Sequence, residues 1–477
     1  MSLIRDEQTL YSEVADRVAG LIDKGTVRPG QKVPSVRKLS AQLKVSVSTV
    51  LQAYRLLEDR GRIVARPQSG YYVRAALAPT PVTRGLERPP RAATRVVIAD
   101  PIGRMLAAST DAAYVHLGGA IPSDATLPTR QLNRISAAIA RRSKRGMNTY
   151  DLPPGCPELR AQIARRYIDA GCELAPDDVM TTCGAQEALM LCLRAVTRPG
   201  DVVAIESPTF YGHLQIIDGL GLRALEIPSC CDEGVSLEAL EAALRGGRHK
   251  IKACLLVTNA QNPSGSVMPD DRKRQLVRLL AKRDVPLIED DTYGDLVYAA
   301  SRAVVCKAFD TSGLVMLCSS FSKTLAPGAR VGWCAPGRFA AEVRRGKIAT
   351  TLATPTLPQM AIAQFLETGG YEHHLRKVRA FYAEQVQLVS AAVQRYFPPG
   401  TRVTRPAGGF VVWVELPGKC DAMRLYESAL ERKISIAPGP IFSATGRFKN
   451  FVRLNCSSPW SSDLDAALRT LGQLCAA

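Results

Sequence analysis

One lysine stands between two hydroxyl residues in the stretch CSSFSKTLAPGARVG, residues 318–332, and an arginine follows it seven positions later. The apolar run just before this stretch predicts a buried strand that leads into it. Between apolar walls a lysine such as Lys323 can lose its proton and act as an amine nucleophile on a carbonyl. Ser320, Ser322 and Arg330 are well suited to bind a phosphate beside that amine. Together they predict a Schiff-base site for pyridoxal phosphate (PLP); the alternative is a surface lysine on a polar loop.

Length and composition favour a globular protein of more than one domain. With 477 residues, 46% hydrophobic and 22% charged, the chain predicts two or three domains. No apolar run approaches the roughly 20 residues that span a bilayer, and the N-terminus lacks the form of a signal peptide. We therefore expect a cytoplasmic protein with no membrane partner. The thirteen cysteines form no C-x-x-C pair, which predicts reduced thiols rather than disulfides or a metal site.

Most of the net charge lies at the front of the chain. Residues 1–145 contain 24 Lys and Arg against 11 Asp and Glu, so they carry +13 of the total +18. This excess favours a polyanionic partner for the front of the chain. The alternative is a basic surface that only aids solubility.

The first 74 residues have the pattern of a winged helix-turn-helix. Apolar spacing and turn residues predict helices over Leu10–Lys24, Ser35–Leu43 and Val47–Asp59. Short strands are expected at Arg62–Arg66 and Tyr71–Arg74, on either side of a Pro- and Gly-containing turn. A recognition helix that enters the major groove needs small polar residues at its start, and basic residues nearby can bind phosphates.

The predicted DNA contacts are Arg37, Lys38, Ser46, Ser48, Thr49, Arg66 and Gln68. The motifs Pro-Ser-x-Arg-x-Leu, Val-Ser-x-Ser-Thr-Val and Gly-x-Ile-x-x-Arg-Pro-x-Ser-Gly around them resemble the GntR family of winged-helix repressors. The resemblance covers about residues 8–74 and implies a DNA-binding domain there. The alternative is a helix-turn-helix that contacts only protein.

Residues 75–112 are expected to be a linker. Ala75–Arg95 is rich in Pro, Ala, Thr and Arg without a hydrophobic period. Its arginines either contact the DNA backbone or are simply solvated. A short helix near Ile102–Ala108 is expected to dock the linker onto the domain that follows.

From about Tyr114, apolar strands alternate with amphipathic helices, which is typical of a doubly wound α/β sheet. The expected strands of this large α/β domain are Asp201–Glu206, Cys254–Thr258, Pro286–Asp290 and Leu314–Cys318. Expected helices include Leu189–Val196 and Arg272–Lys282. A long helix over Tyr371–Tyr396 should lead to a small C-terminal α+β unit with strands at Gly409–Glu415 and Phe451–Cys456.

Polar and aromatic residues follow several of these strands. The turn at Gly184 would put the amides of Ala185 and Gln186 at a helix N-terminus, where a phosphate can bind; a plain helix cap is the alternative. Phe210 offers a platform for a planar ring, unless it only packs in the core. Asn262 can donate a hydrogen bond to an anionic ring oxygen.

Two further positions complete the predicted chemistry. Asp290 ends a strand and can hold a pyridine nitrogen protonated, so that the ring accepts electrons. Tyr293 can reach the phenolic oxygen of the same ring. Arg453 lies in an apolar strand and can pair with a substrate carboxylate; an internal salt bridge is the alternative.

These residues, in this order, resemble the fold-type I aminotransferases over about residues 114–475. By this resemblance Lys323 matches the Schiff-base lysine and Asp290 the partner of the pyridinium nitrogen. Tyr293 and Asn262 match the residues that hold the phenolic oxygen, and Phe210 matches the stacking ring.

The resemblance also implies contacts with the phosphate and with the substrate. The phosphate contacts match Ala185, Gln186, Ser320, Ser322 and Arg330. Tyr150 matches a tyrosine that reaches the phosphate of the neighbouring subunit, and Arg453 matches the arginine for the substrate α-carboxylate. Ala185 replaces a common Ser or Thr, which removes one hydroxyl and leaves the amide.

A GntR winged helix joined to an aminotransferase-like domain, here residues 113–477, resembles the MocR family of bacterial regulators. The resemblance implies a head-to-tail homodimer that binds PLP and an operator in double-stranded DNA. Its aminotransferase-like domain would sense an amino acid, an amine or PLP itself. The alternative is an active PLP-dependent aminotransferase whose DNA-binding domain is accessory.

Overall fold

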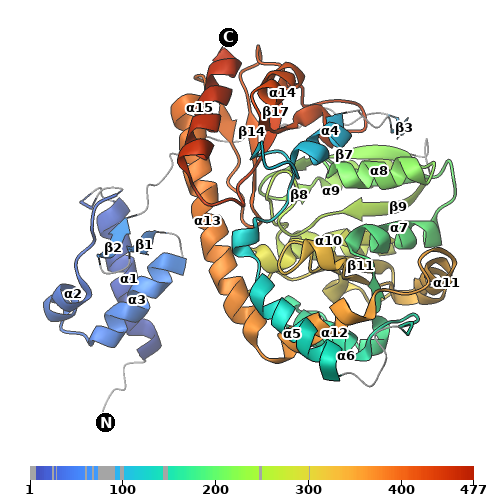
Figure 1. Cartoon of the computed structure of the whole chain (residues 1–477), viewed down its shortest axis with the longest axis horizontal. Coiled ribbons are helices and arrows are strands. Elements are labelled where there is room, and N and C mark those ends of the chain that lie inside the picture. The colour runs from blue at the N-terminus through green and yellow to red at the C-terminus, as the bar shows by residue number, and fades with distance from the viewer. Residues whose placement is uncertain are drawn as a thin grey trace. The chain divides into compact units, whose positions relative to one another are not determined.

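The computed structural model describes residues 7–23, 26–27, 30–59, 62–66, 69–73, 92–96, 101–142, 149–246, 250–299 and 301–476. The chain separates into two compact units, residues 1–80 and 81–477 (Figure 1). Over the described ranges, no helix is long and apolar enough to cross a membrane. The same ranges contain no group of three His, Cys, Asp or Glu side chains that could hold a metal ion.

The N-terminal unit is a winged helix-turn-helix, as the sequence predicts. Its elements are α1 (Glu7–Asp23), α2 (Val36–Leu43), α3 (Val47–Asp59), β1 (Ile63–Arg66) and β2 (Gly70–Val73). Ser35 caps α2 by accepting the amide hydrogen of Lys38 at 3.3 Å. Lys44 then takes a left-handed conformation, with φ of 53°, and turns the chain into α3.

The core of this unit is formed by the inner face of α3 against α1 and the wing. Val50, Tyr54 and Leu57, on this inner face of α3, are all fully buried. β1 and β2 pair as an antiparallel hairpin. Residues 30–33 extend this wing, since the amide of Val33 donates to the carbonyl of Tyr71 at 2.9 Å.

The second unit is built on a large mixed sheet with the strand order β3-β7-β6-β9-β10-β11-β12-β5, and β8 pairs with β7. The strands of this sheet are β3 (Thr94–Arg95), β5 (Met180–Thr182), β6 (Val202–Ser207), β7 (Arg223–Cys230), β8 (Gly234–Val235), β9 (Ile251–Leu256), β10 (Leu287–Asp290), β11 (Val315–Ser320) and β12 (Gly332–Ala335). The run from β7 to β11 is parallel. β12 pairs antiparallel with β11, and β5 pairs antiparallel with β12. The carboxyl ends of the parallel strands therefore meet at one edge.

Helices cover both faces of this sheet. The helices of the unit are α4 (Pro101–Ala108), α5 (Thr129–Arg142), α6 (Pro157–Tyr167), α7 (Ala185–Val196), α8 (Tyr211–Gly219), α9 (Leu237–Arg245), α10 (Asp270–Ala281), α11 (Ala340–Thr350), α12 (Thr356–Glu367), α13 (Gly370–Tyr396), α14 (Ala422–Glu431) and α15 (Ser462–Ala476). On β6, Val203 and Ile205 pack towards α7 and α8, whereas Val202 and Ala204 pack towards α9 and α10. Because helices bury both faces of the strand, its sequence is a continuous apolar run rather than an alternation of apolar and polar residues.

A smaller C-terminal unit closes the domain. Its antiparallel sheet, in the order β13-β14-β17-β16, consists of β13 (Arg402–Val403), β14 (Val411–Glu415), β17 (Phe451–Asn455) and β16 (Ala437–Pro438). A separate parallel pair joins β4 (Val115–His116) to β15 (Ile434–Ser435). In Figure 1, α13 runs from α12 and α5 at one end to α15 and the small sheet at the other.

The end of the predicted linker belongs to this second unit. Residues 74–91 lie outside the described residues, but Thr94–Arg95 forms β3 at the edge of the large sheet. Arg223 holds this edge by donating to the carbonyl of Ala93 at 2.6 Å. The short helix expected near Ile102–Ala108 is α4, which buries Met105 in the core of the small unit.

Candidate functional site

A cleft of about 640 Å³, partly open to solvent, lies where β6, β9, β10 and β11 end. Its lining consists of Ala185, Gln186, Leu189, Phe210, Val257, Asn262, Asp290, Thr292, Tyr293, Ser320, Ser322, Lys323 and Arg330. All of them except Leu189, Val257 and Thr292 are residues that the sequence predicted for one site. The carboxyl edge of a parallel sheet is the usual place for a ligand in α/β folds.

Lys323 follows β11 and presents its amine in the cleft. Its Nζ donates to the carbonyl of Ala120 at 2.6 Å and lies 5.8 Å from the centre of the Tyr293 ring. Burial, and next the positive charge of Arg453, lower the pKa of Lys323 to about 8, although the charge of Asp290 acts in the opposite direction. The amine is thus far closer to its nucleophilic form than an ordinary lysine.

Asp290 is held from two sides at the end of β10. Its Oδ1 accepts hydrogen bonds from the amide and the hydroxyl of Thr292, at 2.9 and 2.5 Å. Its Oδ2 lies 3.0 Å from Nε2 of His213, on α8. Burial alone would raise the pKa of Asp290, but the bonds from His213 and Thr292 outweigh it, so the pKa lies below its usual value. The carboxyl group therefore stays ionised inside a buried site.

His213 is a site residue that sequence reasoning missed. Its Nδ1 lies 3.3 Å from the hydroxyl of Thr209 and its Nε2 faces Asp290. Because an ionised carboxylate can only accept, Nε2 carries the hydrogen of this contact. The only signal in the sequence was a lone histidine within the apolar helix that follows Phe210.

The first turn of α7 and Arg330 meet at one corner of the cleft. A helix N-terminus leaves its first amides without intrahelical acceptors, and those of Ala185 and Gln186 are in this position. Arg330 crosses the turn before them, where its Nη2 donates to the carbonyl of Cys183 at 3.2 Å and its Nη1 to Oγ of Ser322 at 3.4 Å. Two backbone amides, the hydroxyl of Ser322 and the guanidinium of Arg330 thus lie close together. These are the hydrogen-bond donors that suit a phosphate.

Gly184 is necessary for this corner. Its φ is +86°, and a Cβ at this position would lie 2.3 Å from Nη2 of Arg330. The adjacent strand also approaches closely, since a Cβ on Gly332 would lie 2.5 Å from the backbone of Gly184. A side chain at either glycine would displace Arg330 or the helix start.

Among the described residues, two buried polar atoms near the cleft have no hydrogen-bond partner. They are Oη of Tyr293 and Nε of Arg453. Arg453, on β17, is fully buried, donates to Oδ1 of Asn262 at 3.2 Å and also donates to the carbonyl of Gly118. These contacts are with an amide and a carbonyl rather than with the carboxylate of an internal salt bridge. Unpaired buried donors are costly, and a bound ligand with oxygen atoms would satisfy them.

Two predicted site residues of this domain do not line the cleft: Arg453, and Tyr150, which was predicted for the phosphate of the neighbouring subunit. Tyr150 is 75% exposed and is absent from the cleft lining of this chain. Phe210 lines the cleft with its ring folded over Gly212, where a Cβ would come within 2.4 Å of the ring. Gln186 uses its side chain to donate to the carbonyl of Gly212 at 3.1 Å, which leaves only its backbone amide for a phosphate.

In the N-terminal unit, the predicted DNA contacts gather at the helix-turn-helix. Arg37 and Lys38 are exposed on the first turn of α2. Ser46 caps α3, since its Oγ accepts the amide hydrogen of Thr49 at 3.0 Å, and it also contacts the hydroxyl of Ser48 at 2.7 Å. Of the other predicted contacts, the Arg66 side chain and the whole of Gln68 lie outside the described residues.

Both units match known families. Residues 119–471 match the family model described as aminotransferase class I and II, and residues 10–73 match that of the bacterial regulatory proteins of the gntR family. Two similar relatives are the uncharacterized HTH-type transcriptional regulators YjiR and YdcR of Escherichia coli. YjiR is 39% identical over 98% of this chain and 98% of its own length, and YdcR is 40% identical over 97% and 98%.

The chain belongs to the MocR-type GntR family. Its MocR-type aminotransferase domain is also similar to a solved structure, the α-aminoadipate aminotransferase LysN of Thermus thermophilus, complexed with N-(5′-phosphopyridoxyl)-L-leucine. That similarity has a TM-score of 0.72 with 29% identity and covers 80% of this chain and 95% of that chain. The family and fold imply pyridoxal phosphate as the cofactor and DNA binding by the GntR unit.

The residues of the cleft fit this cofactor. The lowered pKa of Lys323 suits an amine that attacks an aldehyde, and the ionised Asp290 suits a protonated pyridine nitrogen. The corner at α7 and Arg330 suits a phosphate. The unpaired Oη of Tyr293 is a donor still available for a ring oxygen.

Proposed function

We propose that this chain is a PLP-dependent transcriptional regulator whose aminotransferase domain senses an amino acid, an amine or PLP itself. The observation that carries the proposal is the cleft that joins a lysine of lowered pKa to an ionised, buried aspartate, in a chain that also has a winged helix-turn-helix. When bound, PLP supplies a covalent anchor for amines and an electron sink.

The residues that we propose to hold the cofactor share the cleft and its rim. Lys323 would bind its aldehyde carbon, and Asp290, supported by His213, would hold a proton on its ring nitrogen. The remaining proposed contacts are Tyr293 and Asn262 with the phenolic oxygen, Phe210 with the ring face, and Ala185, Gln186, Ser320, Ser322 and Arg330 with the phosphate. Each of these is supported by its position in the cleft lining.

Arg453 is the proposed contact for the carboxylate of an amino acid effector. Its Nε is buried without a partner among the described residues, while its other nitrogens are held by Asn262 and Gly118. The rings of Tyr211 and Phe442 lie 5.9 and 5.2 Å from the guanidinium. A charge that is kept buried and incompletely paired supports a role in binding an anionic group that arrives with the ligand.

We also propose that the protein works as a cytoplasmic homodimer, arranged head to tail, in which Tyr150 reaches the phosphate site of the partner. Tyr150 is 75% exposed and Leu152, close beside it in sequence, is 56% exposed. Large side chains exposed to this degree support a contact surface that a single chain leaves uncovered.

The test is a mobility-shift series with the upstream region of the protein's own gene, with and without PLP and candidate amines. Sequence-specific binding that changes when an amine alters the visible absorbance of the bound coenzyme would support the regulator. Binding no stronger than to random DNA of equal length, together with rapid turnover of an amino acid and a keto acid, would replace it with an aminotransferase.

A further inference from the structure

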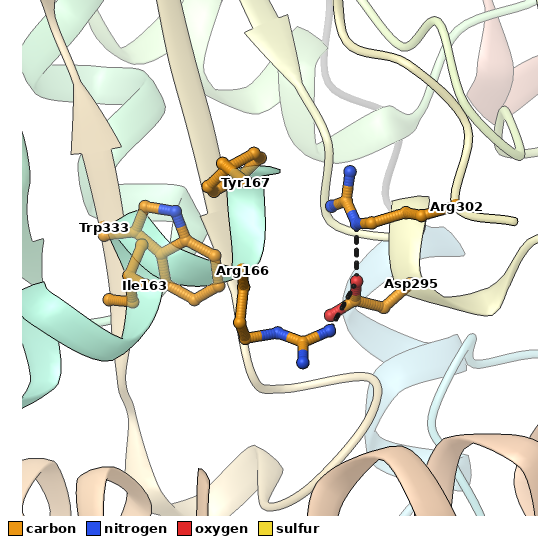
Figure 2. Close-up of a pocket in the computed structure, with 6 residues that line it drawn as sticks. All are labelled: Ile163, Arg166, Tyr167, Asp295, Arg302 and Trp333. Atoms are coloured by element: carbon orange, nitrogen blue, oxygen red, sulfur yellow. Dashed lines mark hydrogen bonds and ion pairs between the residues drawn. The ribbon is translucent and has the colours of Figure 1, made fainter. Parts of the chain in front are cut away.

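A cluster of charged and aromatic side chains lies outside the cleft. Six of its residues surround a small cavity (Figure 2). Figure 2 shows Arg166 and Arg302 directed at the carboxylate of Asp295, with Tyr167 and Trp333 on the other side of the gap. Asp295 accepts from Nε of Arg302 at 2.6 Å and from Nη2 of Arg166 at 3.2 Å. The cluster is largely buried, because the three charged side chains are 7 to 16% exposed.

The cluster reaches the residue next to Lys323. Tyr371, on α13, lies 2.8 Å from Oδ2 of Asp295 and 2.9 Å from the hydroxyl of Thr324. Two arginines hold the pKa of Asp295 below its usual value despite its burial, so the carboxylate can only accept. The single hydroxyl hydrogen of Tyr371 therefore points to Asp295, and Thr324 must donate its own hydrogen to Tyr371. The direction of this chain of hydrogen bonds is fixed by the charge at its end.

A second contact from α13 holds the same residue. Nε2 of His374 lies 2.6 Å from the carbonyl of Thr324, and a carbonyl can only accept, so Nε2 carries the hydrogen. The side chain and the carbonyl of Thr324 are thus both bound to α13, one turn apart. Thr324 is itself buried, with 2% exposure.

The cluster also reaches the residue next to Asp290. Arg302 bridges Asp295 to the carboxylate of Asp291, which also accepts from Oη of Tyr167 at 3.2 Å and from Nδ2 of Asn259 at 3.0 Å. The two loops that carry the lysine and the aspartate of the cleft are therefore connected through one buried network. The charged members of this network are distinct from the residues that line the cleft.

This network is better explained by its effect on the position of Thr324 than by any contribution to the stability of the fold. Two arginines, Arg166 and Arg302, face two aspartates, Asp291 and Asp295, and burying such groups costs about as much as their attraction returns. Well-packed apolar residues of similar size often replace such a network without loss of stability. What apolar residues would not provide is a directed hydrogen bond that fixes the hydroxyl and backbone of Thr324.

We propose that Tyr371 and Asp295 are positioning residues, which hold the amine of Lys323 in its place through Thr324. The inference rests on the proposed function, in which Lys323 binds PLP. It assigns to α13, a helix that continues into the small C-terminal unit, direct control over the geometry of the cofactor lysine.

The test uses full-length variants that each remove one hydroxyl without a change of shape: Thr324→Val and Tyr371→Phe. Thr324→Ser keeps the hydroxyl and should rescue. Tyr426→Phe is the matched control, because Tyr426 is equally buried and its hydroxyl donates to the carbonyl of Pro101, at 3.1 Å, in the core of the small unit. PLP affinity and the pH at which the coenzyme's visible band changes are measured by absorbance titration, and thermal stability is measured in parallel.

Loss of one such hydrogen bond should weaken PLP binding about tenfold in Thr324→Val and Tyr371→Phe and should move the pH midpoint of the band. Thr324→Ser and Tyr426→Phe should keep the wild-type titration, even where Tyr426→Phe lowers the melting temperature. Wild-type titrations in both Thr324→Val and Tyr371→Phe would overturn the inference alone. Wild-type protein that develops no visible band with PLP would overturn the proposed function and the inference with it.

Discussion

Lys323→Met should stabilise the coenzyme-free protein at neutral pH, although it removes the residue on which the cofactor depends. A lysine has an ordinary pKa of 10.5, and burial together with the charge of Arg453 lowers that of Lys323 to about 8. The folded protein thus resists protonating this amine, whereas the unfolded chain does not. Methionine is one atom shorter but keeps most of the unbranched side chain without the charge.

The size of the effect follows from the two pKa values. One pKa unit corresponds to about 1.4 kcal/mol, so protonated Lys323 costs the folded state about 3 kcal/mol of stability at pH 7. This cost is fully present below pH 8, because both states are then protonated, and it disappears as the pH rises towards 10.5. Methionine loses the hydrogen bond to Ala120, worth about 1 kcal/mol. The net gain at pH 7 is therefore about 2 kcal/mol.

The assay is urea unfolding of both proteins, after removal of PLP, at several values between about pH 7 and the ordinary lysine pKa of 10.5. The free-energy difference should shrink with rising pH and change sign near the top of the range. Lys282→Met is the control, because Lys282 is exposed at the end of α10 and should show no such trend. A Lys323→Met protein that is less stable than wild type at pH 7, or a difference that is constant with pH, would refute the reasoning.

Substitutions at four other residues give further predictions. Asp290→Ala should weaken PLP binding and slow the conversion of bound coenzyme by amino acids, as measured by absorbance; unchanged affinity and rate would exclude the assigned role. Arg453→Ala should cost an amino acid effector about 2 to 4 kcal/mol of binding free energy in a spectral titration, whereas an amine without a carboxylate should bind as before. Arg37→Ala should reduce the salt dependence of DNA binding by about one phosphate contact. Thr49→Ala should instead change the preference among operator variants by about 1 to 3 kcal/mol, and identical preferences would remove Thr49 from the base contacts.

The gathering of Phe210, Asn262, Asp290 and Lys323 could be predicted, because each lies at or just beyond the end of a strand in the parallel run. Asp290 and Lys323 lie beyond neighbouring strands, β10 and β11, whose carboxyl ends must share an edge. The glycine turn at Gly184 likewise marks a helix start next to that edge. In the winged unit, apolar spacing and turn residues predicted the helices to within a few residues. Local signals were sufficient wherever the chain itself brings residues to a strand end.

Contacts that depend on distant segments could not be predicted. His213 meets Asp290 across 77 positions, and nothing in the apolar helix around it indicates that partner. The strand Thr94–Arg95 lies in a segment with the composition of a linker, because pairing with β7, rather than its own two residues, makes it a strand. Asn262 and Arg453, predicted for two different ligand groups, bind each other at 3.2 Å.

The Arg–Asp cluster shows why such failures concentrate on charged residues. Asp295 and Arg302 follow a strand in a polar segment, and charged residues in such segments are ordinarily solvated. Arg166 reaches them from α6, 129 positions away, so no periodicity links the three. Their burial is explained by the contacts that the cluster makes with Thr324, through Tyr371, and with Asp291. Thr324 and Asp291 directly follow Lys323 and Asp290. A buried ion network adds little net stability, because the cost of burying the charges offsets their attraction. Such a network is useful where side chains must keep a fixed geometry. Here that geometry is the position of the cofactor lysine.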